Sequence, residues 1–149
     1  MEKTCRLAFL ARWRTTSAFL LCGILILTIS GCCTHKYTDE GMQPLAATAS
    51  DLARAVMRYA EDHPAEAASL DDQELVQRAT AFDPNLLKPY EGLVVRGTAD
   101  GVILVCTSDG RRGLFEDAEC SDKVDKLIWS DSNAPCQFSL KPETVCPEQ

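Results

Sequence analysis

Hydrophobic and polar positions divide the chain into segments with different periodicities. Residues 17–30 form an apolar run of 14 residues that contains no charge. Apolar residues then recur at helical spacing in two segments, 50–63 and 69–81, each of which starts near a capping residue and is followed by a proline. These two segments are predicted helices. From residue 92 onward the apolar segments become short and β-branched, which is typical of strands.

The predicted strands alternate with turn signals. Three segments have strand character: 92–97, 101–107 and 112–116. The pairs Asp100-Gly101 and Asp109-Gly110 lie between them. Asp-Gly favours the tight turns of hairpins because glycine adopts positive φ without steric cost. The three strands are therefore expected to pair as two consecutive antiparallel hairpins.

The ends of the domain carry weaker signals. Residues 121–129 show helical spacing and predict a short C-terminal helix with Trp129 in the core, and residues 137–140 are predicted to add an edge strand. Residues 33–47 show neither period, contain Gly41 and Pro44, and are predicted to form a flexible tether. The expected fold class is α+β, with two N-terminal helices followed by a small antiparallel sheet and a short C-terminal helix.

The N-terminal 31 residues have the layout of an export signal. Four basic residues precede the apolar run: Lys3, Arg6, Arg12 and Arg14. A basic segment followed by a short apolar segment is typical of signal peptides. The apolar run is also shorter than the roughly 20 residues that a transmembrane helix needs. Cleavage is therefore favoured over a permanent membrane span.

The apolar run ends in the motif Ile29-Ser30-Gly31-Cys32. This motif resembles the lipobox of bacterial lipoproteins, which has an aliphatic residue, most often leucine, two small residues and a cysteine. The resemblance implies that a diacylglyceryl group is attached to the Cys32 thiol and that cleavage occurs between Gly31 and Cys32. Several acyl chains would anchor the mature protein stably to a membrane. The alternative is an uncleaved N-terminal membrane anchor.

This interpretation gives a domain organisation and a location. The expected parts are a signal peptide (1–31), a lipidated tether (32–49) and a small periplasmic α+β domain with disulfides (50–149). In Gram-negative lipoproteins the residue after the lipidated cysteine influences sorting, and here it is Cys33 instead of the aspartate associated with inner-membrane retention. We therefore expect the periplasmic face of the outer membrane, with the periplasmic side of the inner membrane as the alternative.

Cysteine usage supports an oxidising compartment. The disulfide candidates in the mature domain are Cys106, Cys120, Cys136 and Cys146. Four cysteines in an exported chain predict two disulfides, and all three ways of pairing them stay open. Zinc sites and redox-active dithiols use closely spaced cysteine pairs, which these four do not form, so neither a metal nor another cofactor is expected.

The charge balance restricts the partners. The chain has 15 basic and 22 acidic residues, and removal of residues 1–31 leaves 11 basic and 21 acidic residues, a net charge of −10. A strongly acidic surface repels phosphate backbones, so nucleic acid is not an expected partner.

No constellation of catalytic residues is recognisable. His35 lies in the predicted tether, and His63 ends a predicted helix, where the helix dipole explains its position. Glu116, Asp117 and Glu119 cluster after the third strand and are expected to face solvent. No residue is therefore assigned a catalytic role.

The functional expectation follows from the anchor and from this lack of catalytic groups. We expect a lipid-anchored cell-envelope lipoprotein that acts as a non-enzymatic module and binds an envelope protein or a cell-wall polymer. Arg111 and Arg112, at the tip of the second hairpin, are the candidate partner-contact residues, because adjacent arginines on a turn suit carboxylate or phosphate groups. The alternative is a cell-wall-active enzyme or enzyme inhibitor that uses the acidic cluster or the two arginines.

Overall fold

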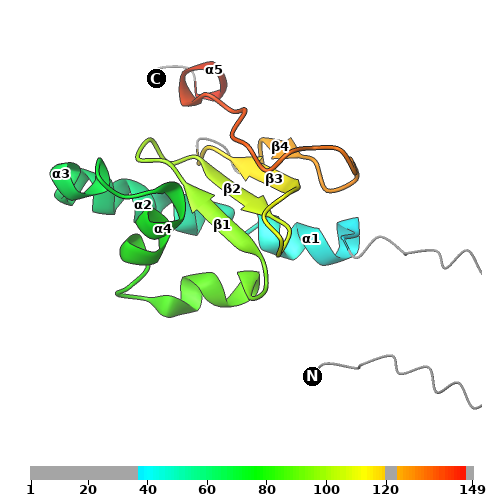
Figure 1. Cartoon of the computed structure of the whole chain (residues 1–149), viewed down its shortest axis with the longest axis horizontal. Helices are drawn as coiled ribbons and strands as arrows, with labels where there is room; N and C mark the ends of the chain where they lie inside the picture. The colour runs from blue at the N-terminus through cyan, green and yellow to red at the C-terminus, as the bar shows by residue number, and fades with distance from the viewer. Residues whose placement is uncertain (1–36, 120–123, 147–149) are drawn as a thin grey trace, which may run out of the picture. The chain divides into compact units, whose positions relative to one another are not determined.

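The computed structural model describes residues 37–119 and 124–146, and this part of the chain has an α+β fold (Figure 1). Helices come first along the chain and a four-stranded antiparallel sheet follows. The helical elements are α1 (Asp39–Ala46), α2 (Ala49–Asp62), α3 (Pro64–Ala67), α4 (Asp72–Ala79), the 3₁₀ helix η1 (Pro84–Tyr90) and α5 (Pro142–Val145). The strands are β1 (Val94–Gly97), β2 (Ile103–Cys106), β3 (Gly113–Asp117) and β4 (Lys126–Leu127). None of the helices in the described ranges is both long and apolar enough to cross a membrane.

Helix α1 lies where a flexible tether was predicted, and that prediction is wrong for residues 39–46. Thr38 caps the helix by accepting a hydrogen bond from the Gly41 N–H, and the buried side chains of Met42 and Ala46 attach it to the core. The helix has only two turns and contains Pro44, so its sequence carries little helical signal. The helix is stabilised instead by the contacts of Met42 and Ala46 with the core.

Helices α2 and α4 correspond to the two predicted helices, but the prediction of two N-terminal helices holds only in part, because α1, α3 and the 3₁₀ helix η1 also precede the sheet. Helix α2 buries Leu52 and Val56 completely. The N-cap of helix α4 is Asp71, whose side chain accepts from the N–H groups of Gln73 and Glu74 in a capping box. The predicted start at Ser69 was therefore two residues early, because the Asp71 carboxylate takes the capping position.

The sheet confirms the three predicted strands and both hairpins. The strand order is β1-β2-β3-β4, and each strand pairs antiparallel with the next. Gly101 and Gly110 have φ of 84° and 66°, as the Asp-Gly turns require. A β-carbon at Gly101 would also lie 2.4 Å from the Met57 sulfur, so this turn is held closely against α2.

The end of the chain differs from the prediction. Within 121–129, the described residues 124–129 contain strand β4, and residues 137–140 form no strand. Leu127 is 45% exposed and Trp129 only 3%, and β4 comprises only Lys126 and Leu127, which pair with Glu116 and Phe115. Pairing with β3 therefore overrides the helical period of this short segment. Trp129 does lie in the core, in edge-to-face contact with Phe115 at 6.5 Å. The short C-terminal helix is α5, after these residues.

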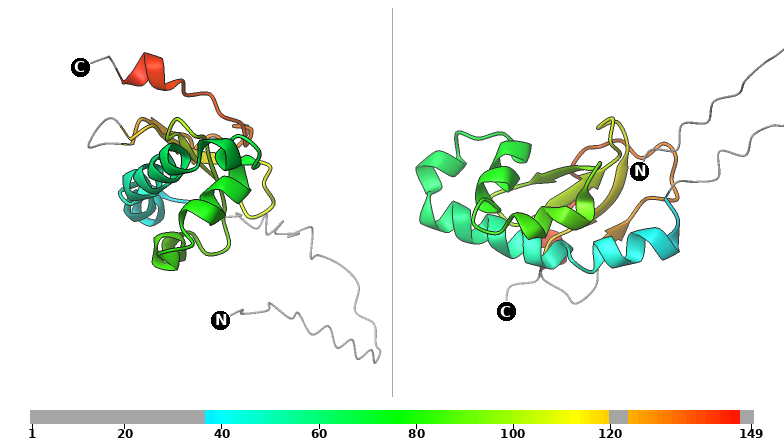
Figure 2. Two further views of the ribbon diagram at one scale, coloured as in Figure 1. Left: turned by 90° about the vertical axis from the view of Figure 1, so that its left-hand side faces the viewer. Right: turned by 90° about the horizontal axis from the view of Figure 1, so that it is seen from below.

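Both faces of the sheet are covered, as Figure 2 shows from the end of the sheet. Ile103, Val105 and Phe115 belong to the main core with the helices. Leu104 and Cys106 alternate with them and pack against the C-terminal segment through Cys136 and Phe138. Because segments lie on both sides, all the residues of β2 and β3 are buried.

Candidate interaction site at the β2–β3 turn

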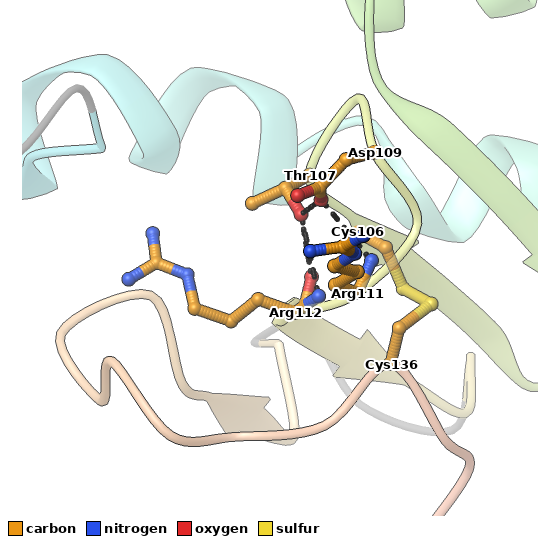
Figure 3. Close-up of a disulfide and its surroundings, with 6 residues drawn as sticks. All are labelled: Cys106, Thr107, Asp109, Arg111, Arg112 and Cys136. Carbon is orange, nitrogen blue, oxygen red and sulfur yellow. Dashed lines mark hydrogen bonds between the residues drawn. A yellow bond between two sulfur atoms is a disulfide. The ribbon is translucent and has the colours of Figure 1, made fainter.

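The turn between β2 and β3 is built by Thr107 and Asp109 (Figure 3). The Thr107 hydroxyl donates to the Asp109 carboxylate at 2.5 Å, and the same carboxylate oxygen accepts from the Arg111 N–H at 3.1 Å. The Gly110 N–H donates to the Thr107 carbonyl at 2.8 Å, and the Thr107 N–H donates to the Arg112 carbonyl at 2.9 Å. These bonds fix the backbone that carries the two predicted arginines.

A disulfide lies at the base of this turn. Cys106, the last residue of β2, is bonded to Cys136 of the C-terminal segment. The Cys136 N–H also donates to the Arg111 carbonyl at 3.0 Å, and Arg112 forms a β-bridge with Pro135. The turn is thus fastened to the C-terminal segment by one covalent bond and by backbone contacts.

The structure places Arg111 and Arg112 together but in different surroundings. The Arg111 side chain is exposed, whereas Arg112 is half-buried. The Arg112 guanidinium lies 5.2 Å from the ring centroid of Tyr37, in a cation–π contact with the residue that leads into α1. Within the described residues neither arginine forms a salt bridge. Both guanidinium groups therefore keep their charge available to a partner.

Asp109 is the carboxylate closest to these arginines along the turn. The hydrogen bond from Thr107, the N–H of Arg111 and the positive charge of Arg111 together lower the pKa of the Asp109 carboxyl. Asp109 is therefore ionised at neutral pH, and the turn carries two positive charges and one negative charge. The hydrogen bonds that build the turn hold the Asp109 carboxylate in place without removing its charge.

The acidic cluster after β3 was expected to face solvent, and this expectation is wrong for Glu116 and Asp117, which are 1% and 2% exposed. The Glu116 carboxylate accepts from the Ser139 N–H, the Leu140 N–H and the Ser139 hydroxyl at 2.7–2.8 Å. Lys126 lies 3.6 Å away and also donates to the Ser139 hydroxyl. Glu116 therefore fastens the C-terminal segment to the sheet.

Asp117 points to the other, helix-covered face of the sheet. Its Oδ1 atom is buried and has no hydrogen-bond partner among the described residues. Burial and, to a smaller extent, the nearby carboxylate of Asp125 raise the pKa of Asp117 to about 6. Asp125 itself accepts from the Ala118 N–H at 2.9 Å, and Glu119 forms an ion pair with Arg54 at 3.5 Å. Asp117 thus keeps a proton at a pH where an ordinary aspartate has lost it.

Replacing Asp117 by asparagine is expected to stabilise the protein at neutral pH. The wild-type carboxyl has a pKa of about 6 in the folded state and about 3.8 in the unfolded state. As the pH rises from about 4 to about 7, the unfolded state ionises first, so wild-type stability falls by an amount on the order of 2 kcal/mol. Asp117→Asn removes this loss, and its advantage over wild type should appear over this pH range.

Denaturant unfolding at a series of pH values measures this difference. The matched control is Asp100→Asn, which changes an exposed aspartate of the β1–β2 turn. If Asp117→Asn shows the same offset from wild type at about pH 4 and about pH 7, the carboxyl of Asp117 does not titrate as described.

Several predicted site residues lie outside the described part of the chain: Gly31, Cys32 and Cys120. Tyr37 and Asp109 contribute to the site although their role was not predicted. Asp109 carries a sequence signal, because a threonine two residues before an Asp-Gly pair can hydrogen-bond the aspartate. Tyr37 carries none, since its contact with Arg112 joins residues 75 positions apart.

No family model, no curated protein and no solved structure matches this chain. The proposed function therefore rests on the residues of this chain.

Proposed function

We propose that this chain is a lipid-anchored lipoprotein of the bacterial cell envelope whose mature domain acts as a non-enzymatic interaction module. The motif Ile29-Ser30-Gly31-Cys32 after the uncharged apolar run carries the proposal, since it combines an export signal with an acceptor thiol. The disulfide between Cys106 and Cys136 supports export, because such bonds persist in oxidising compartments.

The proposed location is the periplasmic face of the outer membrane. It rests on Cys33, which occupies the sorting position after the lipidated cysteine. The alternative location is the periplasmic side of the inner membrane. The net charge of −10 that remains after cleavage supports a partner other than nucleic acid.

The proposal includes a second disulfide, between Cys120 and Cys146. Cys146 is in disulfide form, and Cys106 and Cys136 are already bonded to each other. The Cys146 sulfur also lies 3.7 Å from the carbonyl oxygen of Ala118, two residues before Cys120 in the chain. Together these observations favour Cys120 among the remaining cysteines.

A binding role is favoured over an enzymatic one by the contacts of the acidic cluster. A glycosidase-type mechanism needs a carboxyl group that can reach a substrate. Glu116 is occupied by the C-terminal segment, and Asp117 is buried beneath the helices. The exposed surface of the domain remains for recognition of an envelope protein or a cell-wall polymer. If photo-cross-linking from exposed positions in living cells captures no envelope component, the binding role is contradicted.

The intact mass of the protein extracted from membranes tests the anchor. We expect a mass that corresponds to acylated Cys32 followed by residues 33–149. Alkylation without reductant should modify one cysteine, Cys33, and alkylation after reduction should modify four more.

The control variant is Cys32→Ala, which should carry no lipid and keep residues 1–31, because cleavage in this class follows lipidation. A wild-type mass that includes residues 1–31 without lipid would establish the uncleaved anchor instead. Four further free thiols in the unreduced protein would contradict the two disulfides.

A further inference from the structure

The folded domain begins very close to the proposed anchor. Tyr37 and Thr38 precede α1, and Met42 already lies in the core. Only four residues, 33–36, separate Cys32 from Tyr37. Even a fully extended chain spans at most about 18 Å over these five steps. If Cys32 carries lipid, as proposed above, Tyr37 is held next to the membrane surface.

The β2–β3 turn is connected to this attachment point. The Arg112 guanidinium lies 5.2 Å from the centroid of the Tyr37 ring, and Arg111 is its exposed neighbour in the chain. Two arginines therefore lie at the end of the domain that the lipid holds. Tyrosine favours the membrane–water interface because it combines an apolar ring with a polar hydroxyl.

The charge distribution favours contact at this end of the domain over other faces. The processed chain carries a net charge of −10, so most of its surface is repelled by anionic headgroups. At the turn, Asp109 is the acidic residue, and its carboxylate is bound by the Thr107 hydroxyl and the Arg111 N–H. Arginine forms bidentate hydrogen bonds with phosphate groups, which lipid headgroups supply.

The first turn of α1 is the other source of charge near Tyr37. Asp39 there accepts a hydrogen bond from the indole N–H of Trp129, and Glu40 is exposed. The carboxylates of Asp39, Glu40 and Asp109 thus lie near two guanidinium groups, and this end of the domain is close to neutral, whereas the processed chain as a whole carries a net charge of −10. The turn itself is rigid, because the disulfide between Cys106 and Cys136 closes its base. Rigid placement lowers the entropic cost of contact with the headgroups.

From these observations we infer that Arg111 and Arg112, together with Tyr37, bind the phosphates of anionic lipid headgroups in the membrane that holds Cys32. The inference rests on the proposed lipid anchor. The contact is a second attachment point, and it sets the orientation of the domain: the β2–β3 turn faces the bilayer. The β1–β2 turn then serves as a reference position away from the attachment residues.

Tryptophan fluorescence in vesicles tests this orientation. The processed lipoprotein is reconstituted into phosphatidylethanolamine vesicles with or without phosphatidylglycerol, each containing lipids brominated near the headgroup. Two variants carry a reporter indole on exposed turn residues: Ser108→Trp at the β2–β3 turn and Ala99→Trp at the β1–β2 turn. The buried Trp129 contributes the same background to both. We expect quenching of the Ser108→Trp protein to exceed that of the Ala99→Trp control by about twofold or more, and to rise with phosphatidylglycerol.

Charge reversal identifies the groups responsible. Adding Arg111→Glu and Arg112→Glu to the Ser108→Trp protein should lower its quenching to the level of the Ala99→Trp control. Arg58→Glu, at an exposed position of α2, should leave quenching unchanged. Since Arg112 contacts Tyr37 and its loss could disturb the fold, Arg111→Glu alone is also measured, with circular dichroism as the check on folding.

The outcomes separate this inference from the anchor. An intact mass that shows no lipid on Cys32 contradicts both the proposed anchor and the headgroup contact. If the protein is lipidated but quenching is equal at the two turns, the headgroup contact is contradicted and the lipid anchor is not. The same holds if quenching changes neither with phosphatidylglycerol nor with the arginine substitutions. Photo-cross-linking from Ser108 in cells to an envelope protein instead of lipid also overturns the headgroup contact.

Discussion

Replacing both Cys106 and Cys136 by alanine is expected to lower the free energy of unfolding by about 3 to 4 kcal/mol. The bond closes a loop with a sequence separation of 30, and removing it restores the conformational freedom of that loop to the unfolded chain. The cost is large for a domain of this size, whose total stability is on the order of 10 kcal/mol. Chemical denaturation without reductant measures the difference.

Two controls accompany this measurement. Cys33→Ala removes a cysteine outside the pair and should leave stability unchanged. Reductant should destabilise the wild type by at least as much as the double alanine change, because it opens this bond together with that of Cys146. A double variant as stable as the wild type would mean that the bond between Cys106 and Cys136 contributes nothing.

Replacing Glu116 by alanine is expected to destabilise the protein by about 3 kcal/mol, because a fully buried carboxylate that accepts several hydrogen bonds is lost and its donors are left without partners. These donors are the N–H groups of Ser139 and Leu140 and the Ser139 hydroxyl. The loss of stability should be greatest in the C-terminal segment. Hydrogen exchange of the amides of Ser139 and Leu140 should therefore accelerate more than exchange within β2.

The matched control is Glu61→Ala, which removes an exposed carboxylate near the end of α2 and should change stability by less than about 0.5 kcal/mol. The loss of stability for Glu116→Gln should fall between the two, since its amide oxygen can still accept from the N–H groups of Ser139 and Leu140 but its NH₂ group cannot accept from the Ser139 hydroxyl. Equal effects of Glu116→Ala and Glu61→Ala would contradict the role of Glu116 in holding the C-terminal segment.

The strong periodic signals of the sequence predicted the central elements correctly. Helices α2 and α4 each have a continuous apolar face and a proline soon after their end, and strands β1 to β3 are β-branched and separated by Asp-Gly. These features act locally, because turn conformation and the alternation of apolar residues depend on neighbours in the chain.

Short elements and burial could not be predicted in the same way. Helix α1 is held by Met42 and Ala46 in the core, and β4 exists because it pairs with Phe115 and Glu116. The burial of Glu116 depends on a segment more than 20 residues later in the chain. Such contacts join distant parts of the chain and leave no periodic trace near the residues concerned.

Local residue patterns were enough to predict the α+β class, the two hairpins and the pair of arginines at the second turn, and they are the basis of the proposed export signal and lipobox-like motif. Each of these depends on residue type and local spacing. Only the tertiary structure decided that Cys106 bonds Cys136, that Glu116 and Asp117 are buried, and that Arg112 lies over Tyr37. The physical reason is that pairing, burial and cation–π contact depend on which distant segments pack together, and this packing is a property of the whole folded chain.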